Sequence, residues 1–456
     1  MTKELLAETA ARAAAYLEGL AERRVSPDPE AVRNLDRLAE PLPEGPSDPA
    51  ETLRLLDEVG SPATTATAGP RYYGFVIGGA SPATLAANWL AGAWDQNAGM
   101  VAASPVAARL ERIALGWLVD LLGLPEATAC AFVTGATMAN FTGLAAGRHA
   151  VLRAAGWDVE ADGLFGAPPV TVIVGAEAHT TLHKALGLLG LGRRRVTTVP
   201  VDDQGRMRAD ALPAISGPTL VCLQAGNVNS GAFDPAEVIA RAHDAGAWVH
   251  VDGAFGLWAP VSPAKAHLFD GYAQADSLAT DAHKWLNVPY DSGLAFVRDG
   301  AALRAAFSIR AAYLVHATEF DPMDHTPESS RRARGVEVWA ALRSLGRSGL
   351  RDLIDRTCRH ASRFAEGLRA AGYEVLNDVV LNQVLVSFGP PEMTRRVIAA
   401  LQQDGTCWCG GTEWQGRTAM RISVSSSATT DADVERSLDA MVRLARGEAA
   451  KGGSAR

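Results

Sequence analysis

Four short segments of the sequence carry groups that could act together on one small molecule. They are residues 133–140, 176–181, 247–253 and 275–285. The first is a turn of small residues that leads into a helix, and the N–H groups at the start of a helix form a natural cradle for phosphate. The second segment contains a histidine, and the third ends an apolar run with an aspartate. The fourth places a lysine between a histidine and a tryptophan.

These side chains have complementary chemistry. Lys284 can attack an aldehyde carbon as a nucleophile. Asp252 stands at the end of an apolar run, where a buried carboxylate needs a cationic partner such as a protonated ring nitrogen. With His179 as a flat partner for the ring and the turn within residues 133–140 as phosphate cradle, the set matches what pyridoxal 5′-phosphate requires. Each feature alone has an ordinary structural explanation, such as a solvated lysine. Their joint occurrence in this order, however, predicts the cofactor.

Short apolar runs and helical stretches alternate around these segments. The runs have four to six residues and the nearly continuous apolar character of strands buried on both faces. They lie at residues 170–174, 195–199, 219–223, 247–251 and 293–297, with helical stretches at 180–191 and 235–245. This alternation predicts an α/β fold with a mostly parallel sheet, in which ligands bind beyond the carboxyl ends of the strands. Residues 275–285 show neither a helical nor a strand pattern.

The rest of the chain predicts a helical arm before this sheet and a smaller domain after it. A helix over residues 3–23 precedes a proline-rich stretch, and Ser104 caps a helix that begins at Pro105. After a helix at 336–345 we expect helix 349–371, strand 384–388, helix 391–403, strand 419–424 and helix 431–446, with a loose tail at 447–456. The predicted domains are therefore the arm (1–80), a large cofactor-binding domain (81–345) and a small α+β domain (346–456).

Composition excludes several other classes of protein. The 456 residues carry 43 lysines and arginines against 51 aspartates and glutamates, a formal net charge of −8, so nucleic acid is not an expected partner. The chain has no apolar run of the roughly 18 residues that span a bilayer, and its N-terminus lacks a signal-peptide pattern. The five cysteines are scattered, which favours a reducing compartment, and we predict a cytoplasmic protein.

The chain resembles the group II pyridoxal-phosphate-dependent amino acid decarboxylases, which include the aromatic L-amino acid, histidine and glutamate decarboxylases. The resemblance rests on motifs spread along most of the chain: Gly69-Pro70-Arg71-Tyr72-Tyr73, Ser104-Pro105, His179, Asp252, His283-Lys284-Trp285 and Met420-Arg421. It implies the aspartate-aminotransferase fold (fold type I) and a small-molecule amino acid substrate. It also implies a homodimer with the active site at the interface and the N-terminal arm wrapped round the partner.

The resemblance implies a role for each site residue. Lys284 would carry the cofactor covalently, Asp252 would pair with the pyridinium nitrogen, and His179 would stack on the ring. The remaining cofactor-binding set is Ala136, Thr137 and His283 at the phosphate, with Thr280 and with Asn229, which is expected to hold His179. Tyr313 resembles the tyrosine of the mobile catalytic loop that protonates the substrate carbanion in these decarboxylases.

Three alternatives stay open at this point. An aminotransferase, or a decarboxylase-like protein with oxidative or carbon–carbon chemistry, would use the same cofactor site. A metal-dependent hydrolase could use His250 and Asp252, but no third or fourth ligand stands at a recognisable spacing, so no metal is predicted. Cys407 and Cys409 are interpreted as core thiols rather than as a redox or zinc pair. The substrate stays unnamed, with four candidate contacts: Arg71, Arg310, His316 and Arg421.

Overall fold

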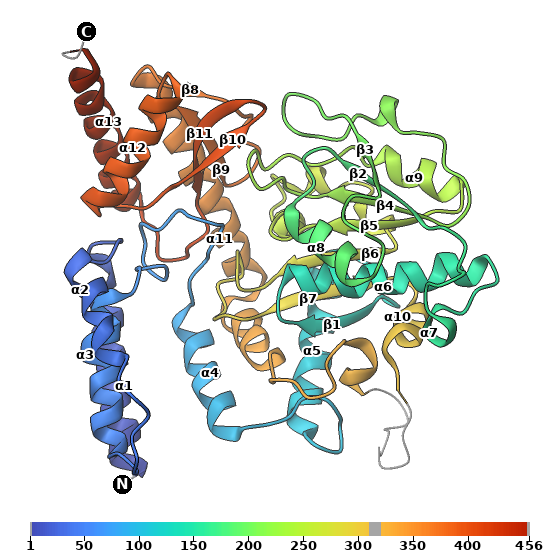
Figure 1. Cartoon of the computed structure of the whole chain (residues 1–456), viewed down its shortest axis with the longest axis horizontal. Helices are drawn as coiled ribbons and strands as arrows, with labels where there is room; N and C mark the ends of the chain where they lie inside the picture. Colours follow the sequence, from blue (N-terminus) through green and yellow to red (C-terminus); the bar gives the residue numbers. More distant parts are fainter. Residues whose placement is uncertain (1, 310–320, 454–456) are drawn as a thin grey trace. The chain divides into compact units, whose positions relative to one another are not determined.

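The computed structural model describes residues 2–309 and 321–453. They form two compact units, which are described separately (Figure 1). The larger unit comprises Gly78–Ala361 and Asn377–Gln383, and the smaller unit comprises Met1–Ile77, Ser362–Leu376 and Val384–Arg456.

A seven-stranded sheet forms the centre of the larger unit. Its strands, in spatial order, are β1 (Ala129–Val133), β7 (Gly293–Val297), β6 (Ser277–Asp281), β5 (Trp248–Asp252), β4 (Thr219–Gln224), β2 (Thr171–Gly175) and β3 (Val196–Val199). All neighbours from β6 to β3 are parallel, whereas β7 runs antiparallel to both β1 and β6. The predicted α/β class with a mostly parallel sheet is therefore confirmed.

Three helices cover one face of this sheet: α6 (Ala136–Ala154), α8 (Thr180–Leu188) and α10 (Gly300–Phe307) (Figure 1). Between them and the strands lies a core of buried apolar side chains that includes Leu144, Val172, Leu186, Leu220 and Leu303. Further helices of the larger unit include α4 (Pro82–Trp94), α5 (Pro105–Leu121), α7 (Val159–Asp162) and α9 (Glu237–Asp244). The hydroxyl of Ser104 accepts a hydrogen bond from the N–H of Ala107, which confirms the predicted cap of α5.

The five strands predicted for the large domain are all present, but the prediction for residues 275–285 was wrong. Ser277–Asp281 form strand β6, in the middle of the sheet. The pattern failed because β6 is buried yet largely polar, and its polar groups are satisfied by hydrogen bonds rather than by water. Ser277 Oγ lies 2.9 Å from both Trp248 Nε1 and His250 Nδ1, and Thr280 Oγ1 donates to the carbonyl of Ala254. Strand β1 also lay outside the prediction.

The smaller unit contains a four-stranded sheet in the order β10-β11-β9-β8. The strands are β10 (Gly410–Trp414), β11 (Arg417–Ser423), β9 (Gln383–Ser387) and β8 (Glu374–Val375), with helices α1 (Thr2–Glu18), α2 (Pro29–Arg33), α3 (Pro49–Ala63), α12 (Pro391–Asp404) and α13 (Asp431–Gly453). Residues 447–453, predicted as a loose tail, belong to α13 instead. The long α11 (Gly335–Ala370) lies in the larger unit up to Ala361. It breaks at Gly346, where the backbone leaves the helical region, so the two predicted helices are confirmed as two segments.

Among the helices that the structure describes, none is both long and apolar enough to cross a membrane.

Candidate active site

Lys284 lies just beyond the end of β6, where it forms an ion pair. Its Nζ is 2.8 Å from Oδ2 of Asp281, the last residue of the strand. The other oxygen of Asp281 accepts a 2.5 Å hydrogen bond from the backbone N–H of Ala136, the first residue of α6, and lies 3.5 Å from Nε2 of His283. The buried Asp281 carboxylate therefore occupies the anion cradle at the start of α6, which the sequence predicted for phosphate.

His283 is held in a fixed orientation beside this ion pair. Its Nδ1 accepts a hydrogen bond from the N–H of Ser292 at 3.0 Å, and its ring stacks on Tyr290 with a centroid distance of 4.2 Å. Burial lowers the pKa of His283, although the charge of Asp281 opposes this shift. Burial, with a further contribution from Asp281, raises the pKa of Tyr290 to about 12. Tyr290 and Asp281 are neighbours of the predicted site that the sequence did not single out.

Asp252 ends β5, the strand next to β6. Its side chain is buried, with Oδ2 accepting from Asn140 Nδ2 at 2.9 Å and Oδ1 accepting from the N–H of Ala254 at 3.2 Å. No lysine or arginine of the described ranges pairs with this carboxylate. Burying an ionised carboxylate without a cation is costly. The site therefore offers a fixed negative charge to a cationic group of a ligand.

His179 is the N-cap residue of α8, four residues after β2 ends. Its Nδ1 accepts from the N–H of Thr181 at 3.3 Å and lies 2.7 Å from Thr181 Oγ1. These contacts fix the imidazole at the same edge of the sheet as Asp252, because β2, β4 and β5 are parallel and their carboxyl ends lie together. Thr181 is a further residue that the sequence did not single out. The predicted hydrogen bond from Asn229 to His179 stays a prediction.

One cavity is lined by three predicted chemical groups together: the amine of Lys284, the carboxylate of Asp252 and the imidazole of His179. It is lined by His179, Gln224, Gly226, Val228, Asp252, Ala254, Phe255 and Lys284. The cavity measures about 20 Å³, room for roughly one water molecule, whereas pockets for small-molecule ligands usually measure about 300–1,000 Å³. Lys284 forms part of its wall and points to Asp281, so this side chain has to leave the ion pair before a ring can enter.

The other predicted residues have mixed outcomes. Thr137 follows Ala136 in the first turn of α6, whereas the hydroxyl of Thr280 is bound to the backbone of the turn after β5. Tyr313 lies outside the described residues, as do the candidate contacts Arg310 and His316. Arg421 lies in β11 of the smaller unit, half-buried, and burial lowers its pKa.

The structure contradicts the prediction of Arg71 as a substrate contact. Its buried guanidinium donates to the carbonyls of Ala21 (2.6 Å) and Thr406 (2.7 Å) and lies 3.1 Å from Asp433. Arg71 therefore ties together segments of the smaller unit that are far apart in sequence. Cys407 and Cys409 are buried reduced thiols, as predicted.

His250 is not available as a metal ligand. Its Nδ1 lies 2.9 Å from Ser277 Oγ, and its Nε2 lies 2.9 Å from Asn140 Oδ1. Burial lowers the pKa of this imidazole to about 3, so it is neutral at ordinary pH with both nitrogens engaged. Over the described part of the chain, no three histidine, cysteine or carboxylate side chains gather as a metal site would require.

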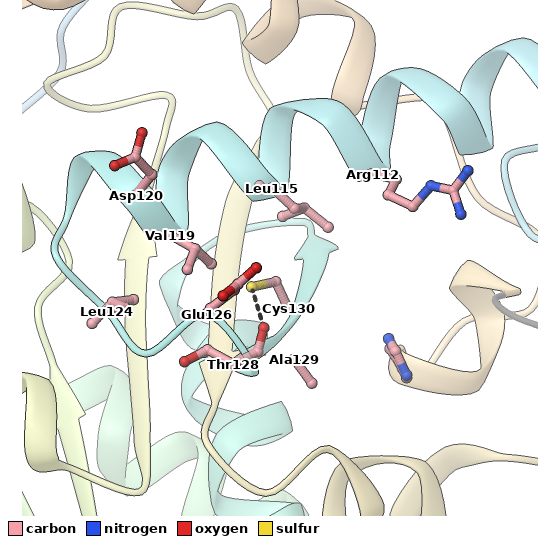
Figure 2. Close-up of a pocket in the computed structure, with 11 residues that line it drawn as sticks. Arg112, Leu115, Val119, Asp120, Leu124, Glu126, Thr128, Ala129 and Cys130 are labelled. Carbon is pink, nitrogen blue, oxygen red and sulfur yellow. Dashed lines mark hydrogen bonds between the residues drawn. The ribbon is translucent and has the colours of Figure 1, made fainter.

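A larger cavity, of about 660 Å³, lies away from these residues. Figure 2 shows it beside α5 and the start of β1, with Arg112, Asp120, Glu126, Thr128 and Cys130 among its lining side chains. None of the residues predicted for the site lines it. The candidate chemistry is therefore separate from the larger cavity.

Comparison with known proteins identifies the family. Residues 41–389 match the family model described as the pyridoxal-dependent decarboxylase conserved domain. The chain belongs to the pyridoxal-dependent decarboxylase family. It is 27% identical over 429 residues to an aromatic-L-amino-acid decarboxylase of Bacillus atrophaeus, covering 89% of this chain and 87% of the relative. It is 30% identical over 453 residues to a histidine decarboxylase of Drosophila melanogaster, covering 92% of this chain and 52% of the relative.

Solved structures show the same fold. The crystal structure of Oryza sativa TDC with PLP and tryptamine superimposes with a TM-score of 0.90 at 24% identity, over 98% of each chain. Mouse CSAD in apo form gives a TM-score of 0.88 at 22% identity, over 97% of this chain and 98% of that one. The predicted family and fold type I are thus confirmed, and the cofactor of this decarboxylase family is pyridoxal phosphate.

The residues present fit this cofactor. Asp252 is a buried carboxylate without a cationic side-chain partner in the described structure, which suits a protonated ring nitrogen. The N–H of Ala136 already binds an anionic oxygen, that of Asp281, where a phosphate oxygen could bind. Lys284 provides an amine in the same cavity as Asp252 and His179.

Proposed function

We propose that this decarboxylase converts an L-amino acid to the corresponding amine and CO2 at the cavity formed by Lys284, Asp252 and His179. One observation carries the assignment of the site: these three side chains line a single cavity at the carboxyl edge of the sheet. The family supplies the reaction type, and the geometry supplies the residues that would perform it.

Pyridoxal phosphate, when bound, supplies an electron sink conjugated to the substrate Cα. Lys284 Nζ is the nucleophile that would hold its aldehyde carbon, and it would have to leave the ion pair with Asp281 to do so. Asp252 keeps a proton on the ring nitrogen and so maintains the sink. His179 would form a flat wall against the ring, and the N–H groups at the start of α6 would hold the phosphate, which would limit how the ring can turn.

The remaining step is the delivery of a proton. The bond between Cα and the carboxyl carbon breaks, its electron pair stays on the Cα side, CO2 leaves, and one proton takes its place on Cα. Tyr313 is the proposed donor of that proton, through its hydroxyl. Lys284 Nζ would then bind the cofactor's aldehyde carbon again in place of the amine nitrogen, and the amine would leave.

A homodimer, with the active site at the subunit interface and the N-terminal arm around the partner, belongs to the same proposal. The apolar helix α4 supports it, because Trp89, Leu90 and Trp94 of this helix are all exposed in the single chain. Leu90→Glu should shift the molecular mass measured by light scattering toward the monomer, and an unchanged dimer would exclude α4 from the interface. We also propose a cytoplasmic location, which the small number and wide spacing of the five cysteines support, and the three-domain division at residues 80 and 345.

The direct test is a panel of L-amino acids incubated with the cofactor-loaded protein. We expect at least one amino acid to release CO2 and amine in equal amounts, and the Lys284→Ala protein to release neither. Formation of keto acid without CO2 would identify an aminotransferase instead.

A further inference from the structure

Asp252 is the last member of a chain of buried hydrogen bonds that the function has not yet used. We propose that Asn140 and His250 are positioning residues that act through Asp252 by holding and polarising its carboxylate. The chain continues from His250 to Ser277 and ends at Trp248. This inference rests on the proposed function, since Asp252 acts only through the bound cofactor.

Four contacts of equal length make up the chain. Trp248 Nε1 lies 2.9 Å from Ser277 Oγ, which lies 2.9 Å from His250 Nδ1. His250 Nε2 lies 2.9 Å from Asn140 Oδ1, and Asn140 Nδ2 lies 2.9 Å from Asp252 Oδ2. All five side chains are buried, and those of Asn140, His250 and Ser277 have no exposed surface. Water therefore cannot replace a lost partner without a rearrangement of the core.

The two ends of the chain fix the direction of every bond. An ionised carboxylate only accepts, so Asn140 must turn its NH2 group to Asp252 and its oxygen to His250. His250 then carries its proton on Nε2, and its Nδ1 accepts the proton of Ser277. At the other end the indole of Trp248 only donates, so Ser277 Oγ accepts from it and is left to donate to His250. Both ends therefore require the same single orientation, with every N–H and O–H pointing along the chain toward Asp252.

The residue spacing on strand β5 and on helix α6 allows this row of hydrogen bonds to form. Trp248, His250 and Asp252 are alternate residues of β5, so they project from one face of the strand. On α6 the facing positions are small: a Cβ added to Gly143 would lie 2.9 Å from His250 Nδ1, and one added to Gly147 would lie 2.7 Å from Trp248 Cδ1. These glycines allow α6 to approach β5 closely enough for hydrogen bonding.

The chain has a specific chemical consequence for Asp252. Aligned donors stabilise the ionised carboxylate and hold it in one rotamer, so its charge stays directed at the ring-nitrogen position. A hydrogen bond to a charged group contributes about 1.5–3 kcal/mol, which corresponds to roughly 10- to 100-fold in an equilibrium constant. We expect loss of these hydrogen bonds to weaken cofactor binding by a factor in that range. We also expect it to lower the pH at which the ring nitrogen loses its proton.

The test compares variants that break the chain with variants that change the same region without breaking it. Asn140→Leu and His250→Leu remove the link, whereas His250→Gln keeps an amide N–H that can donate to Asn140. Thr142→Val is the matched control on α6, because the Thr142 hydroxyl is buried and has no hydrogen-bond partner in the described structure. The readouts are the Kd for pyridoxal phosphate and the 15N NMR signal of the ring-labelled cofactor during a pH titration. Thermal unfolding is recorded for each variant, to separate a change in protein stability from a change in the hydrogen bonding of Asp252.

We expect Asn140→Leu and His250→Leu to raise the Kd by roughly 10- to 100-fold and to shift the ring-nitrogen titration to lower pH. His250→Gln should stay within about threefold of wild type, and Thr142→Val should match it. The proposal is overturned if the ring nitrogen titrates at the same pH in Asn140→Leu as in Thr142→Val. It is also overturned if His250→Leu lowers the Tm but changes neither the Kd nor the ring-nitrogen titration. Since neither readout depends on turnover, a protein that binds the cofactor normally but releases no CO2 would refute the proposed function without affecting this result.

Discussion

Gly78 lies so close to the lysine segment that a single methyl group should displace it. A Cβ added at Gly78 would stand 1.7 Å from the carbonyl oxygen of Lys284, and a backbone atom cannot rotate away as a side chain can. Contacts under 3.0 Å do not persist, so Gly78→Ala requires the two segments to separate by about 1.3 Å. Because a shift of about 1 Å in a reacting group can cost on the order of 100-fold in rate, we expect kcat to fall by at least that factor.

The neighbouring contacts indicate that the displacement reaches Lys284 rather than dissipating in a loop. The N–H of Ser81 donates to the carbonyl of Asn287 at 2.9 Å, and Thr84 Oγ1 donates to the same oxygen at 3.1 Å. Both bonds join residues 81–84 to Asn287, so they hold the two segments together next to the close approach. The assay is single-turnover release of amine from the cofactor-loaded variant, with the cofactor absorbance as a measure of loading.

Gly116→Ala is the matched control, since nothing lies within 4 Å of a Cβ at Gly116, in the helix α5. Alanine in a helix is favoured over glycine by about 1 kcal/mol, so this control should be fully active and slightly more stable. Wild-type kcat in Gly78→Ala, with normal loading, would refute the argument that this contact sets the position of Lys284.

Four further predictions concern single side chains. Lys284→Ala should leave the fold intact by circular dichroism and abolish turnover, because no other amine of the described residues lines the cavity; persistent activity would place the nucleophile elsewhere. Asp252→Ala should slow amine release by about three orders of magnitude and weaken cofactor retention, and near-normal activity would exclude its role at the ring nitrogen. Tyr313→Phe should slow amine release at least about 100-fold while cofactor loading stays normal; an unchanged amine yield and rate would remove the tyrosine as proton donor. Because burial lowers the His250 pKa to about 3, the unfolded chain binds one more proton than the folded chain between about pH 3 and 6.5. Stability is therefore lost as pH falls through this window. His250→Gln should reduce the slope of the unfolding free energy against pH by about 1.4 kcal/mol per pH unit. An unchanged slope, measured by urea unfolding at several pH values, would contradict the buried neutral imidazole.

The parts of the site that apolar patterning marks could be predicted from the sequence. Asp252 ends a continuous apolar run, and His179 follows another, so both could be placed at the carboxyl edge of a parallel sheet. Strand β6 could not be predicted, because its Ser277, Thr280 and Asp281 are polar residues that are buried only through hydrogen bonds to partners elsewhere in the chain.

Long-range contacts explain what the sequence could not provide. Asn140 meets Asp252 across 112 positions of the chain, and its neighbours on α6 show no polar pattern that would mark it. Arg71 had the right charge for a carboxylate contact, but only the folded structure shows that backbone carbonyls occupy its guanidinium. Charge alone therefore does not distinguish a substrate-binding arginine from one that holds distant segments together.

The most direct test of the assigned site is reduction of the cofactor-loaded protein with borohydride, followed by peptide mapping. The chain has five lysines, Lys3, Lys184, Lys265, Lys284 and Lys451, so the modified peptide is unambiguous. We predict that the label appears on the peptide containing Lys284 and that prior removal of the cofactor abolishes it. A label on any of the other four lysines would contradict the account.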